Sequence, residues 1–260
     1  RPAYDNLIQG YAGAMSITGT DKENPVKSGI PIADLGAGLY AVIGILSAIQ
    51  SREKNDSGEH VDISMLDTQV SLLTYMATMH FLSGENPEPI GNQHMNHVPF
   101  NSYRTSDGFI QIGVVAEDFW PSLIEALDLR QLDTEENKTR IGRLKNREHI
   151  DQAVQEVFIT NTTEHWLKIL QEHRVPCGPI NTLSETFQDA DLLKRNMIVE
   201  VLQDSGTSVK MPGNPVKISN HDEEFRRSPK LGEHTAEIFK SWLDKDISCL
   251  LYTSDAADED

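Results

Sequence analysis

One long apolar segment, between residues 35 and 52, constrains the fold of this chain more than any other feature. We expect it to form a single helix with one strongly buried stripe, because its apolar residues recur at helical spacing. The stripe consists of Leu39, Val42, Ile43, Leu46 and Ile49. No apolar run approaches the ~20 residues that a membrane span needs. With 38% hydrophobic and 24% charged residues, the composition fits a soluble globular protein.

The rest of the sequence predicts a mixture of helices and hairpins, and therefore an α/β or α+β fold. Turn signals predict hairpins across 103–115 and 197–211, and alternating apolar residues predict a short strand over 61–65. A loop rich in Gly, Asn, Pro and His covers 84–99, and long loops of this kind are often functional. Further helices are expected near 4–15, 66–82, 118–129, 146–158, 163–173, 189–196 and 232–243.

The charge balance argues against a nucleic-acid-binding protein. The 260 residues include 23 Lys and Arg and 40 Asp and Glu, which gives a net charge of −17, and no basic cluster is larger than Arg226-Arg227. The two cysteines, Cys177 and Cys249, are too few for a disulfide framework or a Cys-rich metal site. This low cysteine usage predicts a reducing, cytoplasmic location.

Both ends of the sequence look incomplete or foreign. The chain begins with Arg1 in a pattern that already reads as a helix start, so we expect a fragment that lacks its true N-terminal part. The segment 246–260 carries five acidic residues and no basic residue, and it has no helical or strand period. We expect residues 244–260 to be a non-native or disordered tail and exclude them from the fold.

Asp34 is the first candidate for chemistry. It stands at the entry of the long helix, after Pro31, where backbone N–H groups and the helix dipole favour an ionised carboxylate. An ionised carboxylate can act as a nucleophile. Its position equally fits a simple N-cap, and the spacing alone favours the cap.

Gly36, Gly38 and Gly44 interrupt the same helix. Each lowers helix stability by ~1 kcal/mol relative to Ala, so a close approach is expected there, either by a neighbouring helix or by a ligand. The string from Gly36 to Ala41 also fits a loose G-x-G-x-x-A dinucleotide pattern. Pro31 stands where that motif needs a central strand, which argues against a nucleotide site.

The other residue patterns do not indicate a metal site or a second nucleophile. His94 and His97 are three residues apart, but no third ligand is spaced with them and there is no H-E-x-x-H motif. We therefore expect no metal site. Cys177 lies between two prolines, a position that suggests packing more than nucleophilic attack. From the residue patterns alone, the chain is an α/β protein that could be an enzyme.

A series of short sequence strings is more informative than these patterns. Taken together and in order, the strings resemble the class III CoA-transferases. This family includes formyl-CoA transferase, carnitine CoA-transferase and α-methylacyl-CoA racemase. The similarity runs from Arg1 to about Leu243. The strings are Arg1–Asp5, Gly13–Gly19, Gly29–Asp34, Gly38–Ala41, Ile43–Leu46, Gly58–Asp67, Gly91–His94, Asp107–Gly108, Val175–Ile180 and Leu231–Thr235.

The resemblance implies the α/β class III CoA-transferase fold and a homodimer of two interlocked chains. On this basis an incomplete, Rossmann-like large domain is joined to a smaller α+β domain. Residues 1–70 would form part of the large domain with the catalytic helix, 71–190 the small domain and connecting helices, and 191–243 a return to the large domain. The missing N-terminal part would supply much of the CoA pocket.

The resemblance also implies a mechanism. CoA would pass from an acyl-CoA to a free, dicarboxylic acid through a covalent aspartyl-CoA intermediate on Asp34. Coenzyme A would be a substrate, with no permanently bound cofactor. The residues implied in binding CoA or substrate are Arg1, Tyr4, Asp5, Gly91, Asn92, Gln93 and His94. The loop from Gly91 to His94 lacks the consecutive glycines of formyl-CoA transferase, which argues against formyl or oxalyl chemistry.

Two alternatives stay open. One is an isomerase like α-methylacyl-CoA racemase, but its glutamate would fall on Ala116, with Glu117 one residue away. The other is an inactive fragment that lacks half of the CoA site.

Overall fold

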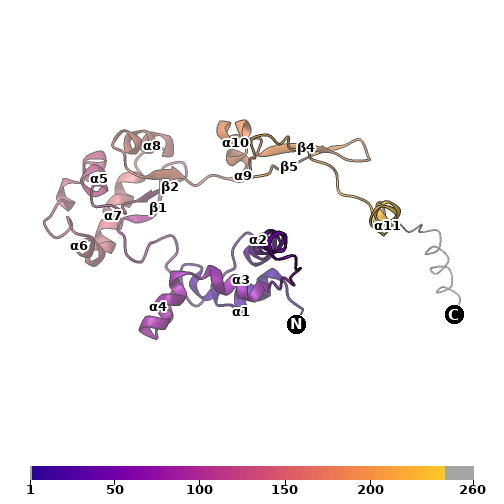
Figure 1. Cartoon of the computed structure of the whole chain (residues 1–260). Helices are drawn as coiled ribbons and strands as arrows, with labels where there is room; N and C mark the ends of the chain where they lie inside the picture. The colour runs from indigo at the N-terminus through magenta and orange to yellow at the C-terminus, as the bar shows by residue number, and fades with distance from the viewer. Residues whose placement is uncertain (1, 244–260) are drawn as a thin grey trace. The chain divides into compact units, whose positions relative to one another are not determined.

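The structure is a computed structural model that describes residues 2–243. The described residues divide into two compact units, unit 1 up to residue 180 and unit 2 from residue 181, whose helices and strands are labelled in Figure 1. The predicted mixture of helices and antiparallel hairpins is confirmed. The domain boundaries implied by the resemblance, at 70, 190 and 243, stay a prediction. Residues 244–260, expected to be a tail, lie outside the described residues.

The first part of unit 1 is helical. Helix α1 (Asp5–Tyr11) and the 3₁₀ turn η1 (Ala14–Ile17) precede the long helix α2 (Ile32–Asn55), which has 24 residues. Helices α3 (Met65–Leu72) and α4 (Tyr75–Ser83) follow, and α1, α2 and α3 contact one another. A single helix was expected over 66–82, but Thr74 has a positive φ of 49°, which interrupts it.

The long helix is confirmed, but its apolar stripe is not buried in this chain. Leu39 is 67% exposed and Leu46 is 61% exposed, so the expectation of a buried stripe is wrong here. By length and composition α2 could also cross a membrane, which corrects the prediction that no apolar run approaches that length. One such helix is weak evidence for a span, because core helices of soluble proteins meet the same criteria.

The second part of unit 1 contains a three-stranded antiparallel sheet with the order β1-β2-β3. Strands β1 (Phe100–Arg104) and β2 (Phe109–Gly113) form the predicted hairpin, and β3 (Cys177–Pro179) pairs with β2. The predicted strand over 61–65 does not form: residues 58–64 have no regular structure and Met65 begins α3. Among residues 2–243 no strand pairs with that segment, so alternation alone could not make it a strand.

Five helical segments pack with this sheet around one hydrophobic core. They are α5 (Phe119–Leu127), η2 (Arg130–Leu132), α6 (Arg140–Lys145), α7 (Arg147–Phe158) and α8 (Thr163–Glu172). The fully buried Trp120, Phe158 and Leu170 belong to this core. Helix α8 is capped by Thr162, whose side chain accepts from the His165 N–H.

Arg143 is the most unusual residue of this core, because its side chain is charged and only 1% exposed. Its Nε donates to the Val98 carbonyl at 2.9 Å, and its Nη1 donates to the Asn137 carbonyl at 3.0 Å. Its Nη2 lies 2.8 Å from a carboxylate oxygen of Glu117, and its guanidinium lies 5.2 Å from the ring centre of Trp120. Arg143 therefore fixes α6 to the end of the 84–99 loop.

Unit 2 consists of small elements. Helices α9 (Leu183–Thr186) and α10 (Ala190–Lys194) precede the predicted hairpin of β4 (Ile198–Leu202) and β5 (Ser208–Pro212). Helix α11 (Thr235–Leu243) follows a segment without regular structure.

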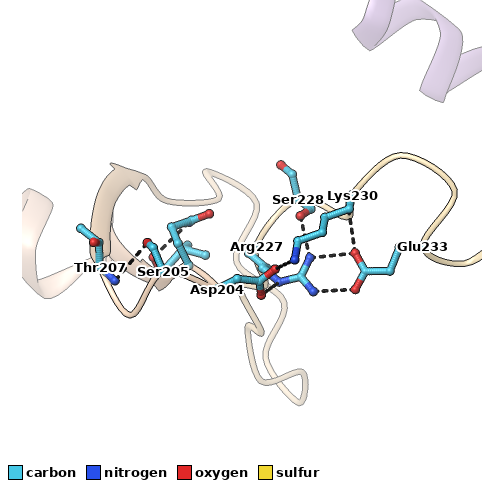
Figure 2. A network of polar contacts seen from close by, with 9 residues as sticks. Asp204, Ser205, Thr207, Arg227, Ser228, Lys230 and Glu233 are labelled. Atoms are coloured by element: carbon cyan, nitrogen blue, oxygen red, sulfur yellow. Dashed lines mark hydrogen bonds and ion pairs between the residues drawn. The ribbon is translucent and has the colours of Figure 1, made fainter.

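A network of charged side chains connects the β4–β5 turn to the segment before α11 (Figure 2). Arg227 pairs with Asp204 on one side and donates two hydrogen bonds to Glu233 on the other. Lys230 contributes its side chain to Asp204 at 2.8 Å and its backbone N–H to Glu233 at 2.7 Å. These hydrogen bonds lower the pKa of Glu233 to about 2, chiefly through Arg227.

Replacing Arg143 tests the buried network. In Arg143→Met the Val98 and Asn137 carbonyls lose their donor, and the loss of a buried hydrogen bond costs about 1–3 kcal/mol. We expect the free energy of unfolding to fall by roughly 2–5 kcal/mol. Urea titration followed by Trp120 and Trp166 fluorescence measures it. Arg130→Met, at an exposed ion pair, is the control and should change stability by less than about 0.5 kcal/mol. Equal midpoints for the two variants would contradict this role.

Titration of Glu233 tests the network of unit 2. Because its folded pKa lies below the ordinary value of 4.5, its contribution to stability is complete above about pH 4.5 and is lost as the pH falls toward 2. A carboxyl-carbon NMR titration should give a midpoint near 2, and Arg227→Gln should return it toward 4.5. Arg226→Gln, which removes the pair with Glu224, should leave it unchanged. A midpoint near 4.5 in the unsubstituted protein would refute the network.

Candidate active site

The start of α2 places Asp34 in the first helical turn and not before it. The helix begins at Ile32 and its N-cap is Pro31, so Asp34 is the third helical residue. Its side chain is exposed, and within residues 2–243 it accepts no hydrogen bond. The interpretation of Asp34 as the N-cap is therefore wrong. The carboxylate is exposed at the start of the helix.

The cap of α2 comes from another helix. Asp5, in the first turn of α1, accepts the backbone N–H of Ala33 on its Oδ1 at 2.9 Å. Its other oxygen, Oδ2, accepts from the side chain of Gln9 at 2.6 Å. Both carboxylate oxygens of Asp5 thus have partners within the chain. The binding role that the resemblance implies for Asp5 stays a prediction.

Gln9 is a residue of this site that the sequence analysis missed. Its side chain is 1% exposed. Its Oε1 accepts the backbone N–H of Ser28 at 2.8 Å, and its Nε2 donates to Asp5. The spacing of Asp5 and Gln9, four residues apart on one helix, would have predicted their contact. Nothing in the local sequence would have predicted the bonds to Ser28 and Ala33.

The three glycines of α2 divide into two groups. A Cβ at Gly36 would lie 2.9 Å from Thr68, and one at Gly44 would lie 2.7 Å from Val61, so both glycines allow close packing within the chain. A Cβ at Gly38 would meet nothing within 4 Å. Since Gly38 lies four residues after Asp34, the two share a helix face. The open space is therefore beside the candidate nucleophile.

The 91–94 segment lies in the loop between α4 and β1, and hydrogen bonds hold it from several sides. The Gly91 N–H donates to the Gly19 carbonyl at 2.7 Å, and the Asn92 side chain donates to Ser102 at 2.5 Å. The Gln93 N–H donates to the Ile90 carbonyl at 3.3 Å. In the part of the chain that the structure describes, no hydrogen bond or ion pair joins this segment to Asp34.

His94 is the most constrained residue of that segment. Its carbonyl accepts from Arg147 at 2.7 Å, its ring Nδ1 accepts the Asn96 N–H at 3.0 Å, and its ring lies 4.7 Å from that of His97. Partial burial lowers the pKa of His94, and the charges of His97 and Arg147 add to this. The neutral form of this imidazole is therefore favoured near pH 7.

The remaining predicted binding residues lie at the start of the chain. Tyr4 is 73% exposed and is the N-cap residue of α1, while Arg1 lies outside the described residues. A cavity of about 350 Å³ lies near η1, and one of about 740 Å³ lies beside α1 and the start of α3. The larger cavity is lined by Pro2, Ala3, Leu7, Ile8, Tyr11, Ile63, Ser64, Met65 and Leu66, and so does not include Asp34.

Comparison with known proteins then decides the family. The sequence profile of CoA-transferase family III matches residues 1–235. The chain belongs to CoA-transferase family III. It is 30% identical over 245 residues to succinyl-CoA:glutarate CoA-transferase from Homo sapiens, a match that covers 94% of this chain and 56% of that protein. It is 31% identical over 248 residues to acetyl-CoA:oxalate CoA-transferase from Acetobacter aceti, covering 93% and 62%.

The fold of this chain matches that of a solved structure from the same family. A CAIB/BAIF family protein from Brucella suis superimposes with a TM-score of 0.78 at 32% identity, covering 92% of this chain and 62% of that one. The predicted mixed α/β fold of the class III CoA-transferases is thus confirmed. The chain spans little more than half the length of the curated relatives named above.

Metal-binding geometry does not occur in the described part of this family III chain. Among residues 2–243, no three His, Cys, Asp or Glu side chains are placed to hold a metal ion. Cys177 is half-buried, and burial raises the pKa of its thiol, which makes it a poor nucleophile.

Alanine substitutions at the glycines test the division between packing and open space. Gly38→Ala should stabilise the chain by about 0.5–1 kcal/mol, since Ala favours the helix and meets no neighbour. Gly36→Ala should gain nothing or destabilise by about 1 kcal/mol, because the methyl group overlaps Thr68. Urea unfolding followed by far-UV circular dichroism measures both. Equal stabilisation by the two changes would show that Gly36 is not needed for packing.

Proposed function

We propose that the protein transfers CoA from an acyl-CoA to a free carboxylic acid, with Asp34 as the nucleophile. Membership of CoA-transferase family III supports the reaction type. The observation that supports Asp34 is its position: a carboxylate without a hydrogen-bond partner in the described chain, in the first turn of α2 and beside the open space at Gly38.

The reaction would proceed through four exchanges at carbonyl carbons. The Asp34 carboxylate attacks the acyl thioester, forming a mixed anhydride and releasing CoA thiolate. The thiolate then attacks the aspartyl carbonyl, giving an aspartyl-CoA thioester and the free donor acid. The acceptor carboxylate attacks that thioester, which forms a second anhydride and frees the thiolate. The thiolate finally attacks the acceptor acyl carbon, and the Asp34 carboxylate is regenerated.

Coenzyme A is a substrate in this scheme, with no permanently bound cofactor or metal. Each intermediate is sensitive to hydrolysis, so water must be kept from the site. We propose that Tyr4 and the segment from Gly91 to His94 contribute to binding, as does Arg1.

A dicarboxylic acid is the proposed acceptor. Relatives named for succinyl-CoA with glutarate and with mesaconate support this choice, the latter from Haloarcula hispanica at 30% identity. The 91–94 segment has only one glycine, in contrast to the glycine run of formyl-CoA transferase. The relative named for acetyl-CoA and oxalate shows that the family also includes oxalate as a partner acid.

The contacts of Glu117 do not favour racemase chemistry. One carboxylate oxygen of Glu117 pairs with Arg143, and the other accepts the backbone N–H of Arg140 at 3.2 Å. Glu117 therefore has a structural role at the start of α6. Since Ala116 occupies the position of the racemase glutamate, we propose transferase activity.

We also propose that the protein forms a homodimer and that it is located in the cytoplasm. The exposed stripe of α2, which includes Leu39 and Leu46, is an apolar surface that a second chain or a further part of the protein could cover. The reducing location is proposed from the low cysteine content.

Trapping the covalent intermediate tests this function in the full-length protein. With succinyl-CoA, hydroxylamine should convert Asp34 to a hydroxamate that peptide mass spectrometry detects, and Asp34→Ala should lower transfer by at least about 10³-fold. Asp62→Ala, at an exposed aspartate with no hydrogen bond in the described chain, is the control and should retain activity. Undiminished transfer by Asp34→Ala would refute the assignment. Washing of deuterium into the α-carbon, without transfer, would indicate a racemase.

A further inference from the structure

Helix α2 has no N-cap side chain of its own. Its N-cap residue is Pro31, which offers no side-chain acceptor, although the first backbone N–H groups of any helix need partners. A capping side chain normally accepts from the second or third helical residue. Ala33 is the second residue of α2, and its N–H is accepted by Asp5, 28 residues earlier in the chain. A residue of α1 therefore does the capping that Pro31 cannot do.

The capping carboxylate is itself held in place. Gln9 is almost fully buried, and its amide group donates to Asp5 Oδ2 at 2.6 Å. The other end of the same amide accepts the N–H of Ser28 at 2.8 Å. Gln9 thus connects Asp5 to the segment that leads into α2. The beginning of α2 is fixed at Ala33 and again, five residues earlier, at Ser28.

Asp34 follows the capped residue directly. Its side chain accepts no hydrogen bond in residues 2–243, so its direction is set by the backbone of the first turn. Ala33 is fully buried, so the same turn packs against its neighbours. Any opening of that turn would change where the Asp34 carboxylate lies relative to an approaching thioester.

We propose that Asp5, oriented by Gln9, is a positioning residue for Asp34. It completes the first turn of α2 and so fixes the direction of the nucleophilic carboxylate. This inference rests on the proposed function of Asp34. It differs from the role that the resemblance implies for Asp5, because contact with the substrate is not required.

Amide hydrogen exchange in the full chain tests the cap without reference to activity. In Asp5→Ala the Ala33 amide should exchange about fivefold faster, as expected for the loss of a typical cap. Asp5→Asn keeps an oxygen acceptor and should restore most of the protection. Asn6→Ala, at an exposed position of the same turn, is the matched control and should not change the rate at Ala33. An unchanged rate at Ala33 in Asp5→Ala would overturn the proposal.

Kinetics of CoA transfer test the positioning role. Asp5→Ala should lower kcat between about tenfold and 100-fold, with KM for the acyl-CoA within about threefold, because a misdirected nucleophile reacts slowly after normal binding. Asp5→Asn should recover most of kcat. Gln9→Glu retains the acceptor for Ser28 but loses the donor to Asp5, so kcat should fall in the same direction.

The possible results distinguish a positioning role of Asp5 from a role in substrate binding. A higher KM with unchanged kcat in Asp5→Ala, together with normal kinetics in Gln9→Glu, would assign Asp5 to substrate binding and overturn the positioning role. Full activity of Asp34→Ala would instead refute the proposed function, and the exchange rate at Ala33 would still decide whether Asp5 caps α2.

Discussion

The structure around the candidate nucleophile depends on how the first turn of α2 is completed. A helix of 24 residues starts after a proline, and its second N–H is satisfied by a carboxylate on a different helix. Capping of this kind requires α1 and α2 to be packed together before the turn can form. The local geometry at Asp34 is thus a product of tertiary structure, although the residue itself stands in a recognisable sequence string.

Helix α2 is more exposed than its apolar pattern predicts. The helix was expected to have one strongly buried stripe, yet all five residues of that stripe are exposed in this chain. The Brucella suis protein aligns with this chain over 62% of its own length, so more than a third of that fold has no counterpart here. Within residues 2–243, α2 packs against α1 and α3, and Gly36 and Gly44 allow the close approach of Thr68 and Val61.

Sequence patterns predicted elements well where neighbours in the chain determine them. The hairpin around Asp107-Gly108 and the amphipathic helices α7 and α8 formed as expected, because their turns and partners are local. The strand at 61–65 failed because a strand needs a partner that no sequence period can show. At the candidate site, Asp34 was proposed from its position and from the family string, and its role stays a prediction. Gln9 was missed because its contact with Ser28, 19 residues later in the chain, forms only on folding.

The loop between α4 and β1 has a consequence for how acids would be selected. Gly91 is tied to Gly19, Asn92 to Ser102, and the carbonyl of His94 to Arg147. A loop held by hydrogen bonds at several residues is rigid, in contrast to a hinged loop that closes over a bound molecule. In the binding role proposed for this loop, its rigidity would select acids by size and shape as they bind, so selectivity would lie in binding affinity and not in a later closing step.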